Sequence, residues 1–191
     1  MKILDTKIPD VKIIEPAVFG DERGFFMETF QERKMAEAGI RAKFVQDNHS
    51  SSGQGILRGL HFQKNQTQGK LVRVIRGEVF DVAVDLRKDS NTFGEWVGVT
   101  LSAKNKIILW VPEGFAHGFY VTSKQAEFVY KCTNYYAPEH ECSLLWNDPD
   151  LSIKWPLVNG MPPNLSQKDR AALPLKETGY FINDKFVEYK N

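Results

Sequence analysis

The sequence lacks the features that mark several large classes of protein. Its 191 residues include two cysteines, too few for a disulfide framework, and no apolar run that approaches membrane-spanning length. Its 25 Lys and Arg against 24 Asp and Glu leave no global field that would recruit nucleic acid or an acidic membrane. The phosphate-binding loop G-x-x-x-x-G-K-[ST] does not occur, which argues against a P-loop nucleotidase. Any recognition of an anion must therefore be local.

The first residues also lack a charged leader followed by an apolar core. The spacing of Cys132 and Cys142 suits no zinc motif, so we expect free thiols in a cytoplasmic protein. The length predicts a single domain over residues 1–191 that is large enough to bury a core. Neither repeats, low-complexity tracts nor linkers divide the chain.

What the sequence does contain is a series of short strand patterns. In the strand pattern at 79–86, Phe80, Val82, Val84 and Leu86 fall on one face and Asp81, Asp85 and Arg87 on the other, which predicts one buried face. Similar strand patterns occur at 71–75, 96–101, 107–111, 115–121 and 127–133. We expect a short helix at 32–38 and another opened by the capping box at 166–169. The pattern predicts an all-β sandwich or barrel.

The segment Leu57–Gln63, followed by Gly69 and Lys70, places His61 between two cations among apolar residues. Arg58 and Lys70 are expensive to bury without an anionic partner, and nearby positive charge keeps an imidazole neutral and available as a base. The alternative is that both are surface cations and His61 is a core histidine. Strict alternation puts Arg58 and His61 on opposite faces of a strand. If both meet one ligand, we expect a bulge or bend at Gly59.

Other polar residues form candidate contacts. Tyr130 shares a strand face with Phe128, so its phenol should point into the interior, where a hydroxyl needs a partner. Gln46 and Asn48 share one side of a strand and could hydrogen-bond a polyhydroxylated ligand, or they could be ordinary turn residues. Arg23 lies among aromatics and could clamp a planar or phosphorylated ligand, or it could be a solvated turn cation.

Several blocks follow one another along nearly the whole chain: Arg23-Gly24, Gln46-Asp47-Asn48, Arg58-Gly59-Leu60-His61, Gly69-Lys70, Pro112-Glu113-Gly114-Phe115-Ala116-His117-Gly118, Tyr130-Lys131 and Lys168-Asp169. This order resembles the dTDP-4-dehydrorhamnose 3,5-epimerase family, and the segments 59–78 and 112–117 resemble the two cupin motifs. The resemblance implies a jelly-roll cupin and a cytoplasmic homodimer. It also implies 3,5-epimerisation of dTDP-4-dehydro-6-deoxy-D-glucose to dTDP-4-dehydro-L-rhamnose, a step of dTDP-L-rhamnose biosynthesis for surface polysaccharide.

The resemblance also implies residue roles. His61 is the expected base and Tyr130 the acid, Asp169 orients the base, and Lys70 lies beside the 4-keto oxygen of the sugar. Tyr136 is expected to stack on thymine. Substrate-contacting positions are Arg23, Glu28, Gln46, Asn48, Arg58, Lys70, His117, Glu141 and Lys168. Asp169 can serve both the capping box and the base only if its two oxygens are shared. We expect no cofactor and no metal.

This chemistry suits the residue types. The 4-keto group acidifies the protons at C3 and C5, so a base must remove each proton from one face and an acid must return one to the other. Imidazole titrates near neutral pH, which suits His61 to the first task. An ammonium such as Lys70 can hold the developing enolate oxygen.

Three alternatives remain open. His61, Glu78 and His117 could form a two-histidine, one-carboxylate metal site, although Gln63 is a poor ligand and the nearby cations would repel a metal. A non-catalytic sugar-nucleotide or carbohydrate binding module would explain the arginines and aromatics. An epimerase acting at one carbon, or a 3,4-ketoisomerase, would use the same base and acid. The tail beyond Gly179 is expected to carry nothing catalytic.

Overall fold

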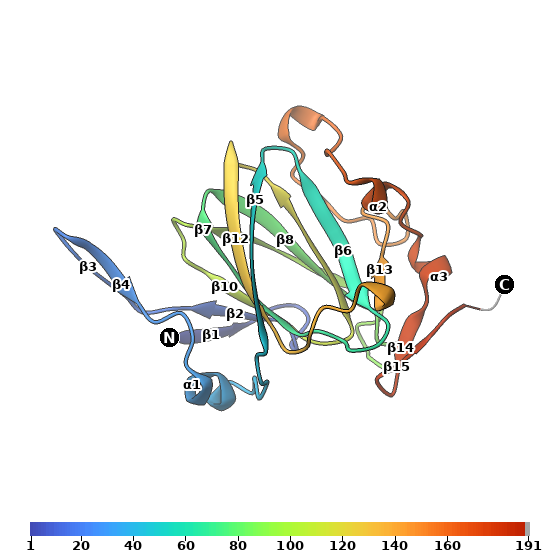
Figure 1. Ribbon diagram of the computed structural model, residues 1–191, viewed down its shortest axis with the longest axis horizontal. Helices are drawn as coiled ribbons and strands as arrows, with labels where there is room; N and C mark the ends of the chain where they lie inside the picture. The colour runs from blue at the N-terminus through green and yellow to red at the C-terminus, as the bar shows by residue number, and fades with distance from the viewer. Residues whose placement is uncertain (190–191) are drawn as a thin grey trace.

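The computed structural model describes residues 1–189 and contains two antiparallel β-sheets that pack face to face (Figure 1). The six-stranded sheet has the order β1 (Lys2–Asp5), β2 (Lys12–Glu15), β10 (Ile108–Val111), β7 (Lys70–Arg76), β12 (Gln125–Cys132) and β5 (Gln46–Gly53). The five-stranded sheet has the order β13 (Glu141–Ser143), β6 (Leu57–Gln63), β11 (Phe115–Val121), β8 (Glu78–Asp85) and β9 (Trp96–Ser102).

The remaining elements are small. Two hairpins pair β3 (Val18–Asp21) with β4 (Gly24–Met27) and β14 (Tyr180–Ile182) with β15 (Lys185–Val187). The helices are α1 (Glu32–Glu37), α2 (Gln167–Arg170) and α3 (Leu175–Thr178), with 3-10 turns η1 (Pro138–His140) and η2 (Val158–Gly160). The prediction of an all-β protein with a few short helices is confirmed. No helix in residues 1–189 combines the length and apolar character needed to cross a membrane.

Strand β8 is buried on both faces, which corrects the prediction of one buried face. Val79 and Ala83 pack into the core between the sheets, whereas Val82 and Val84 pack into a second core on the outer face of the five-stranded sheet. The C-terminal third of the chain, shown in orange and red, covers that outer face (Figure 1). Asp81 and Asp85 alternate with Val82 and Val84, so they lie on the face that packs against the six-stranded sheet, and each buried acid needs hydrogen-bond partners inside the protein.

The pairing of β6 with β11 contains the irregularity that the sequence required. His61 lies opposite His117 and Arg58 lies opposite Phe119, so β6 holds one more residue than β11 over this interval. Gly59 adopts a φ of +116°, and a Cβ at this position would lie 2.6 Å from the Cα of Gly118. Only glycine therefore fits this bulge without strain. The extra residue allows Arg58 and His61 to face one cavity, as predicted.

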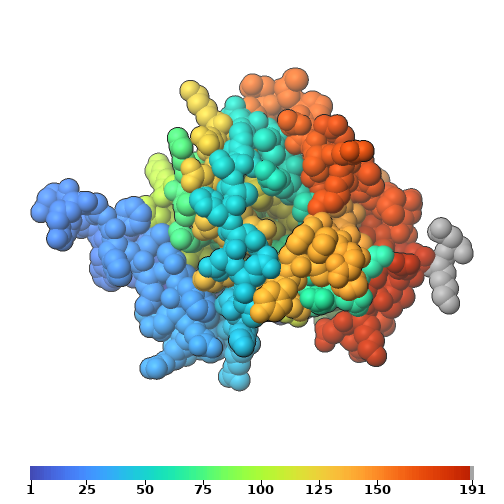
Figure 2. Space-filling view, viewed as in Figure 1, coloured from blue at the N-terminus to red at the C-terminus, as the bar shows by residue number. Residues whose placement is uncertain are grey.

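Residues 18–27, here called the arm, form the hairpin β3–β4 and project from the body of the protein (Figures 1 and 2). Its aromatic residues Phe19, Phe25 and Phe26 are exposed. Strands β1 and β2 form one edge of the six-stranded sheet.

Candidate active site

A cavity of about 340 Å³ lies between the two sheets and is large enough for a small ligand. It brings together most of the predicted site residues: His61, Lys70, Tyr130, Gln46, Asn48, Arg58, His117, Tyr136, Glu141 and Lys168. His61 comes from β6 and Tyr130 from β12, which belong to opposite sheets. The predicted base and acid therefore line one cavity from opposite sides.

His61 and Asp169 form a buried pair at this cavity. The Nε2 atom of His61 lies 2.5 Å from Oδ1 of Asp169, whose side chain is almost fully buried. Burial lowers the pKa of His61, against the opposing effect of the hydrogen bond with Asp169. Burial alone would raise the pKa of Asp169, but its hydrogen bonds with His61 and Ser166 bring it below its ordinary value. The imidazole is therefore held neutral beside a carboxylate.

The capping box and the pairing with the base share Asp169, as the sequence required. Ser166 caps helix α2 by accepting a hydrogen bond from the backbone N–H of Asp169 at 3.1 Å. The hydroxyl of Ser166 donates to Oδ2 of Asp169 at 2.8 Å, while Oδ1 faces His61. One carboxylate therefore opens the helix and orients the imidazole, each through a different oxygen.

Lys70 begins β7 with its side chain inside the protein, where the residue is 9% exposed. Burial lowers the pKa of its ammonium group, and Asp81 and Glu141 oppose this shift through their negative charge. Lys70 makes no ion pair within 4.0 Å with any residue in the described part of the chain. The ammonium group is thus a desolvated cation available to a ligand in the cavity.

Tyr130 stands on β12 beside Phe128, with 5.8 Å between the ring centroids, which confirms that the two share a face. Burial raises the pKa of its phenol to about 12, and Arg58 opposes that shift. Its hydroxyl makes no hydrogen bond to any protein atom in residues 1–189, so the partner that we expected inside the protein is not there. A protonated phenol is thus free to act on a ligand in the cavity.

A second, more exposed group of side chains lines the mouth of the cavity. Glu141 accepts hydrogen bonds from Lys168 at 2.6 Å and from the hydroxyl of Tyr136 at 2.8 Å. Burial alone would raise the pKa of Glu141, but these two contacts lower it. Arg58 is exposed at this end and donates from Nε to the hydroxyl of Ser52 at 2.9 Å.

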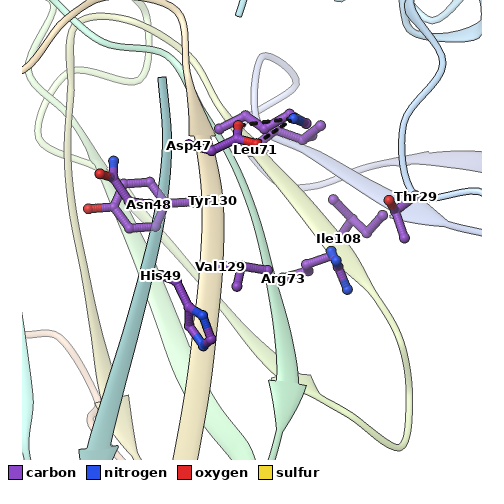
Figure 3. Close-up of a pocket in the computed structure, with 10 residues that line it drawn as sticks. Thr29, Asp47, Asn48, His49, Leu71, Arg73, Ile108, Val129 and Tyr130 are labelled. Atoms are coloured by element: carbon purple, nitrogen blue, oxygen red, sulfur yellow. Dashed lines mark hydrogen bonds and ion pairs between the residues drawn. The ribbon is translucent and has the colours of Figure 1, made fainter. Parts of the chain in front are cut away.

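Gln46 and Asn48 both line the cavity from β5, as predicted from their spacing. The side-chain amide of Gln46 donates to Oδ1 of Asn48 at 3.1 Å. Asn48 and Tyr130 lie together, on the side of β12 away from Val129 and Arg73 (Figure 3). The side chains of Gln46 and Asn48 are therefore held by the hydrogen bond between them and by their positions on β5.

The structure adds a buried pair that the sequence analysis missed. Asp81 is fully buried on β8, and its Oδ1 lies 2.9 Å from Nε2 of His117. Its Oδ2 has no hydrogen-bond partner among residues 1–189. The alternation of β8 predicts a polar outer face for Asp81, but this residue shares its face with Val79 and Ala83, which pack between the sheets. The signal was an acid within the otherwise apolar run of β8, where both neighbouring strands are also apolar.

Two predicted substrate contacts do not reach the cavity of their own chain. Arg23 lies in the arm with 82% of its side chain exposed, and it pairs with Asp21 at 2.5 Å. Glu28 follows β4 and pairs with Lys34 at 2.8 Å. Neither lines the cavity, because the arm projects from the body (Figure 1).

The alternative metal site does not form. Glu78 begins β8 and accepts a hydrogen bond from Thr122, whereas His117 lies opposite Ala83, five residues further along the same strand. The strand rise places five residues about 16 Å apart. Within the described residues, no group of three His, Cys, Asp or Glu side chains could hold a metal ion.

A second hollow of about 360 Å³ lies on the outer face of the six-stranded sheet, beside Thr29 just after the arm (Figure 3). His49, Arg73 and Val129 line it and alternate with residues of the cavity, whereas Asn48 and Tyr130 border both hollows. This hollow and the cavity therefore lie on opposite faces of strands β5 and β12.

Comparisons of the chain with a family model, with known sequences and with solved structures all match the same family. The family described as dTDP-4-dehydrorhamnose 3,5-epimerase matches residues 5–177. The dTDP-4-dehydrorhamnose 3,5-epimerase of Shigella flexneri is 57% identical over 184 residues, which cover 95% of this chain and 100% of that protein. The crystal structure of a Legionella pneumophila dTDP-6-deoxy-D-glucose-3,5-epimerase with dTDP-4-keto-L-rhamnose matches with a TM-score of 0.88 and 59% identity. That match covers 91% of this chain and 92% of the other.

A more distant structure bears on the reaction outcome. The 3'-monoepimerase of Streptomyces bikiniensis, solved with dTDP-quinovose, matches with a TM-score of 0.83 and 33% identity over 90% of this chain and 86% of that one. The same fold therefore supports enzymes that are described as acting at one carbon or at two.

Proposed function

The chain belongs to the dTDP-4-dehydrorhamnose 3,5-epimerase family, and from this premise we propose how its cavity carries out the reaction. It is an isomerase that converts dTDP-4-dehydro-6-deoxy-D-glucose to dTDP-4-dehydro-L-rhamnose by epimerisation at C3 and C5. The observation that carries the proposed residue roles is the placement of His61 and Tyr130 on opposite sides of one cavity that also contains Lys70.

His61 removes the proton next to the 4-keto group. Its Nε2 faces Asp169, which leaves Nδ1 to accept a proton from the sugar. Because burial lowers the pKa of His61, the imidazole is unprotonated near neutral pH. The carboxylate of Asp169 then stabilises the imidazolium that forms.

Lys70 and Tyr130 complete the transfer. As the C–H bond breaks, its electron pair moves toward the carbonyl oxygen, and the ammonium of Lys70 stabilises the resulting enolate. The enolate carbon then takes a proton from the phenol of Tyr130 on the opposite face, and the carbonyl is restored. His61 has gained one proton and Tyr130 has lost one, so both exchange with solvent before the next carbon reacts. Arg58 favours the transient phenolate.

The nucleotide occupies the mouth of the cavity in this proposal. Arg58 and Lys168 balance the diphosphate charge, and Tyr136 offers an exposed aromatic face on which thymine stacks. Gln46, Asn48, His117 and Glu141 supply hydrogen-bonding groups along the cavity wall. We assign the two-sheet architecture to the cupin jelly-roll class. Two free cysteines are consistent with a reducing, cytoplasmic location.

We also propose a homodimer. The arm exposes three phenylalanines, and exposed apolar patches of this kind mark interaction sites. Arg23 and Glu28 lie outside the cavity of their own chain, so they can contribute to substrate binding only at the cavity of a second copy. Sedimentation at micromolar concentration should give twice the mass of one chain. A monomeric protein with full activity would contradict this assignment.

The function is tested by solvent exchange into the substrate. In D₂O the wild-type protein should incorporate deuterium at C3 and C5 of the dTDP-linked ketosugar, and NMR should identify dTDP-4-dehydro-L-rhamnose. His61→Ala should reduce exchange at both carbons by about 10³-fold or more, because the only proposed base is gone. His49→Ala, outside the cavity, is the matched control.

Three results would redirect the assignment. Binding of the ligand without any exchange would leave a binding module. Exchange and inversion at C3 alone would make the chain a monoepimerase, as in the Streptomyces bikiniensis relative. Exchange that persists in His61→Ala would place the base elsewhere.

A further inference from the structure

The exposed Tyr136 is held in place by an unusual set of contacts. Tyr136 is 52% exposed and lies in the loop between β12 and η1, where little packing fixes it. Instead, glutamine side chains bind the backbone of the whole segment 134–137. We call Gln46, Gln63 and Gln68 the glutamine clamp.

Gln63 is the centre of this clamp. It ends strand β6 two residues after His61 and is 4% exposed. Its Oε1 accepts from the N–H of Ala137 at 2.9 Å, and its Nε2 donates to the carbonyl of Tyr135 at 3.2 Å. Gln63 thus forms hydrogen bonds with the residues on both sides of Tyr136. The second hydrogen of Nε2 is used as well, toward the carbonyl of Gln66 at 2.6 Å.

The other two glutamines extend the same pattern. Gln46 accepts from the backbone N–H of Tyr136 at 2.9 Å, and Gln68 donates to the carbonyl of Asn134 at 2.8 Å. The phenol of Tyr136 is fixed separately through Glu141, which pairs with Gln63 across strands β13 and β6. Tyr136 is therefore restrained at its backbone and at its hydroxyl, while its ring face stays open.

This arrangement depends on a neutral amide at position 63. The site requires one acceptor and two donors from a single planar group, which the glutamine side chain provides. A carboxylate of the same shape would keep the contact with Ala137 but would face two backbone carbonyls without a proton. The carbonyls of Tyr135 and Gln66 would lose the donors that hold the loop, which can release it.

We propose that Gln63 is a positioning residue for nucleotide recognition: it fixes Tyr136 as a preorganised platform for the base of the nucleotide. The inference rests on the proposed function, because it takes the aromatic platform as the nucleotide end of the cavity. Holding the ring in its bound orientation removes an ordering cost from binding. Gln63 therefore acts on substrate affinity, although it follows the catalytic base by only two residues.

The test compares Gln63→Glu with Tyr136→Ala and with the double variant. Calorimetry measures the Kd of dTDP, and product formation measures KM and kcat. We expect Gln63→Glu to raise Kd and KM about tenfold or more, with kcat changed less than about twofold. The double variant should bind dTDP no more than about twofold more weakly than Tyr136→Ala, because both changes remove the same platform.

Gln54→Glu is the matched control, since Gln54 also donates to a backbone carbonyl, that of Thr122, at 2.8 Å but does not line the cavity. It should leave Kd, KM and kcat unchanged. If Gln63→Glu fails to fold, Gln68→Ala is the alternative variant. It removes one hydrogen bond of the glutamine clamp at a partly exposed residue and should raise the Kd of dTDP about threefold.

Two results would overturn the inference while the wild-type enzyme still turns over its substrate. One is a fall in kcat with an unchanged KM in Gln63→Glu. The other is a double variant whose loss equals the product of the two single losses. If the wild-type protein neither binds dTDP nor epimerises the sugar, the proposed function itself is wrong.

Discussion

The two ends of the cavity are built on different principles. At the inner end, His61, Lys70 and Tyr130 are desolvated, and their pKa values are displaced by burial. At the mouth, Arg58 and Tyr136 are exposed and keep their places through hydrogen bonds to neighbouring side chains. The inner end controls protonation and the mouth controls position. Substitutions at the two ends should therefore separate into effects on kcat and effects on KM.

The largest effect outside the base itself is expected at the acid. Tyr130→Phe keeps the ring and its packing on Phe128 but removes the only proton that the phenol can return. Because His61 remains, hydrogen exchange should persist at a reduced rate, while formation of the inverted product falls by about 10²–10³-fold with little change in KM. NMR in D₂O measures both quantities in one sample.

Tyr180→Phe, in the C-terminal hairpin and outside the cavity, is the control for this substitution. Undiminished formation of dTDP-4-dehydro-L-rhamnose by Tyr130→Phe would remove the phenol from the mechanism. A raised KM with unchanged kcat would instead show that Tyr130 positions the substrate and does not return the proton.

A smaller and more specific effect is expected at Asp81. The negative charge of Asp81 raises the pKa of Lys70 against the effect of burial. The other titratable groups near the Lys70 ammonium are Cys132, Glu141, Lys168 and His61. Lys70 must be protonated to stabilise the enolate, so activity is lost as pH rises through its pKa. Asp81→Asn removes one negative charge and lowers that pKa further.

The alkaline limb of kcat against pH should therefore move to lower pH in Asp81→Asn. The acid limb, which reflects protonation of His61, should move less. Asp47→Asn is the control, because Asp47 is an acid on the outer face of β5 that pairs with Lys131. An alkaline limb that stays in place would show that Asp81 serves only to orient His117.

Part of this site could be predicted from local geometry. The conflict between Arg58 and His61 on one strand required a bulge at Gly59, and the pairing of β6 with β11 contains it. The two demands on Asp169 required that its oxygens be shared, and they are. In both cases the constraint lies within a few residues of sequence, where backbone periodicity is a reliable guide.

The features that were missed depend on segments far away in sequence. The alternation in β8 indicated a polar, solvent-facing side for Asp81, but that side faces the six-stranded sheet, so the environment of Asp81 depends on strands far away in sequence. The glutamine clamp joins residues about 70 to 90 positions apart, and single glutamines carry no periodic signal. The separation of Arg23 and Glu28 from the cavity follows from how far the arm projects, which no local pattern encodes.

The shared carboxylate of Asp169 links local order to reactivity. Helix α2 is a single turn, and its first hydrogen bonds depend on Ser166 and Asp169. Short helices of this kind open more readily than paired strands. When the turn opens, His61 loses its orienting partner while both sheets remain intact. Local opening of these four residues would therefore separate Asp169 from His61 without disturbing either sheet.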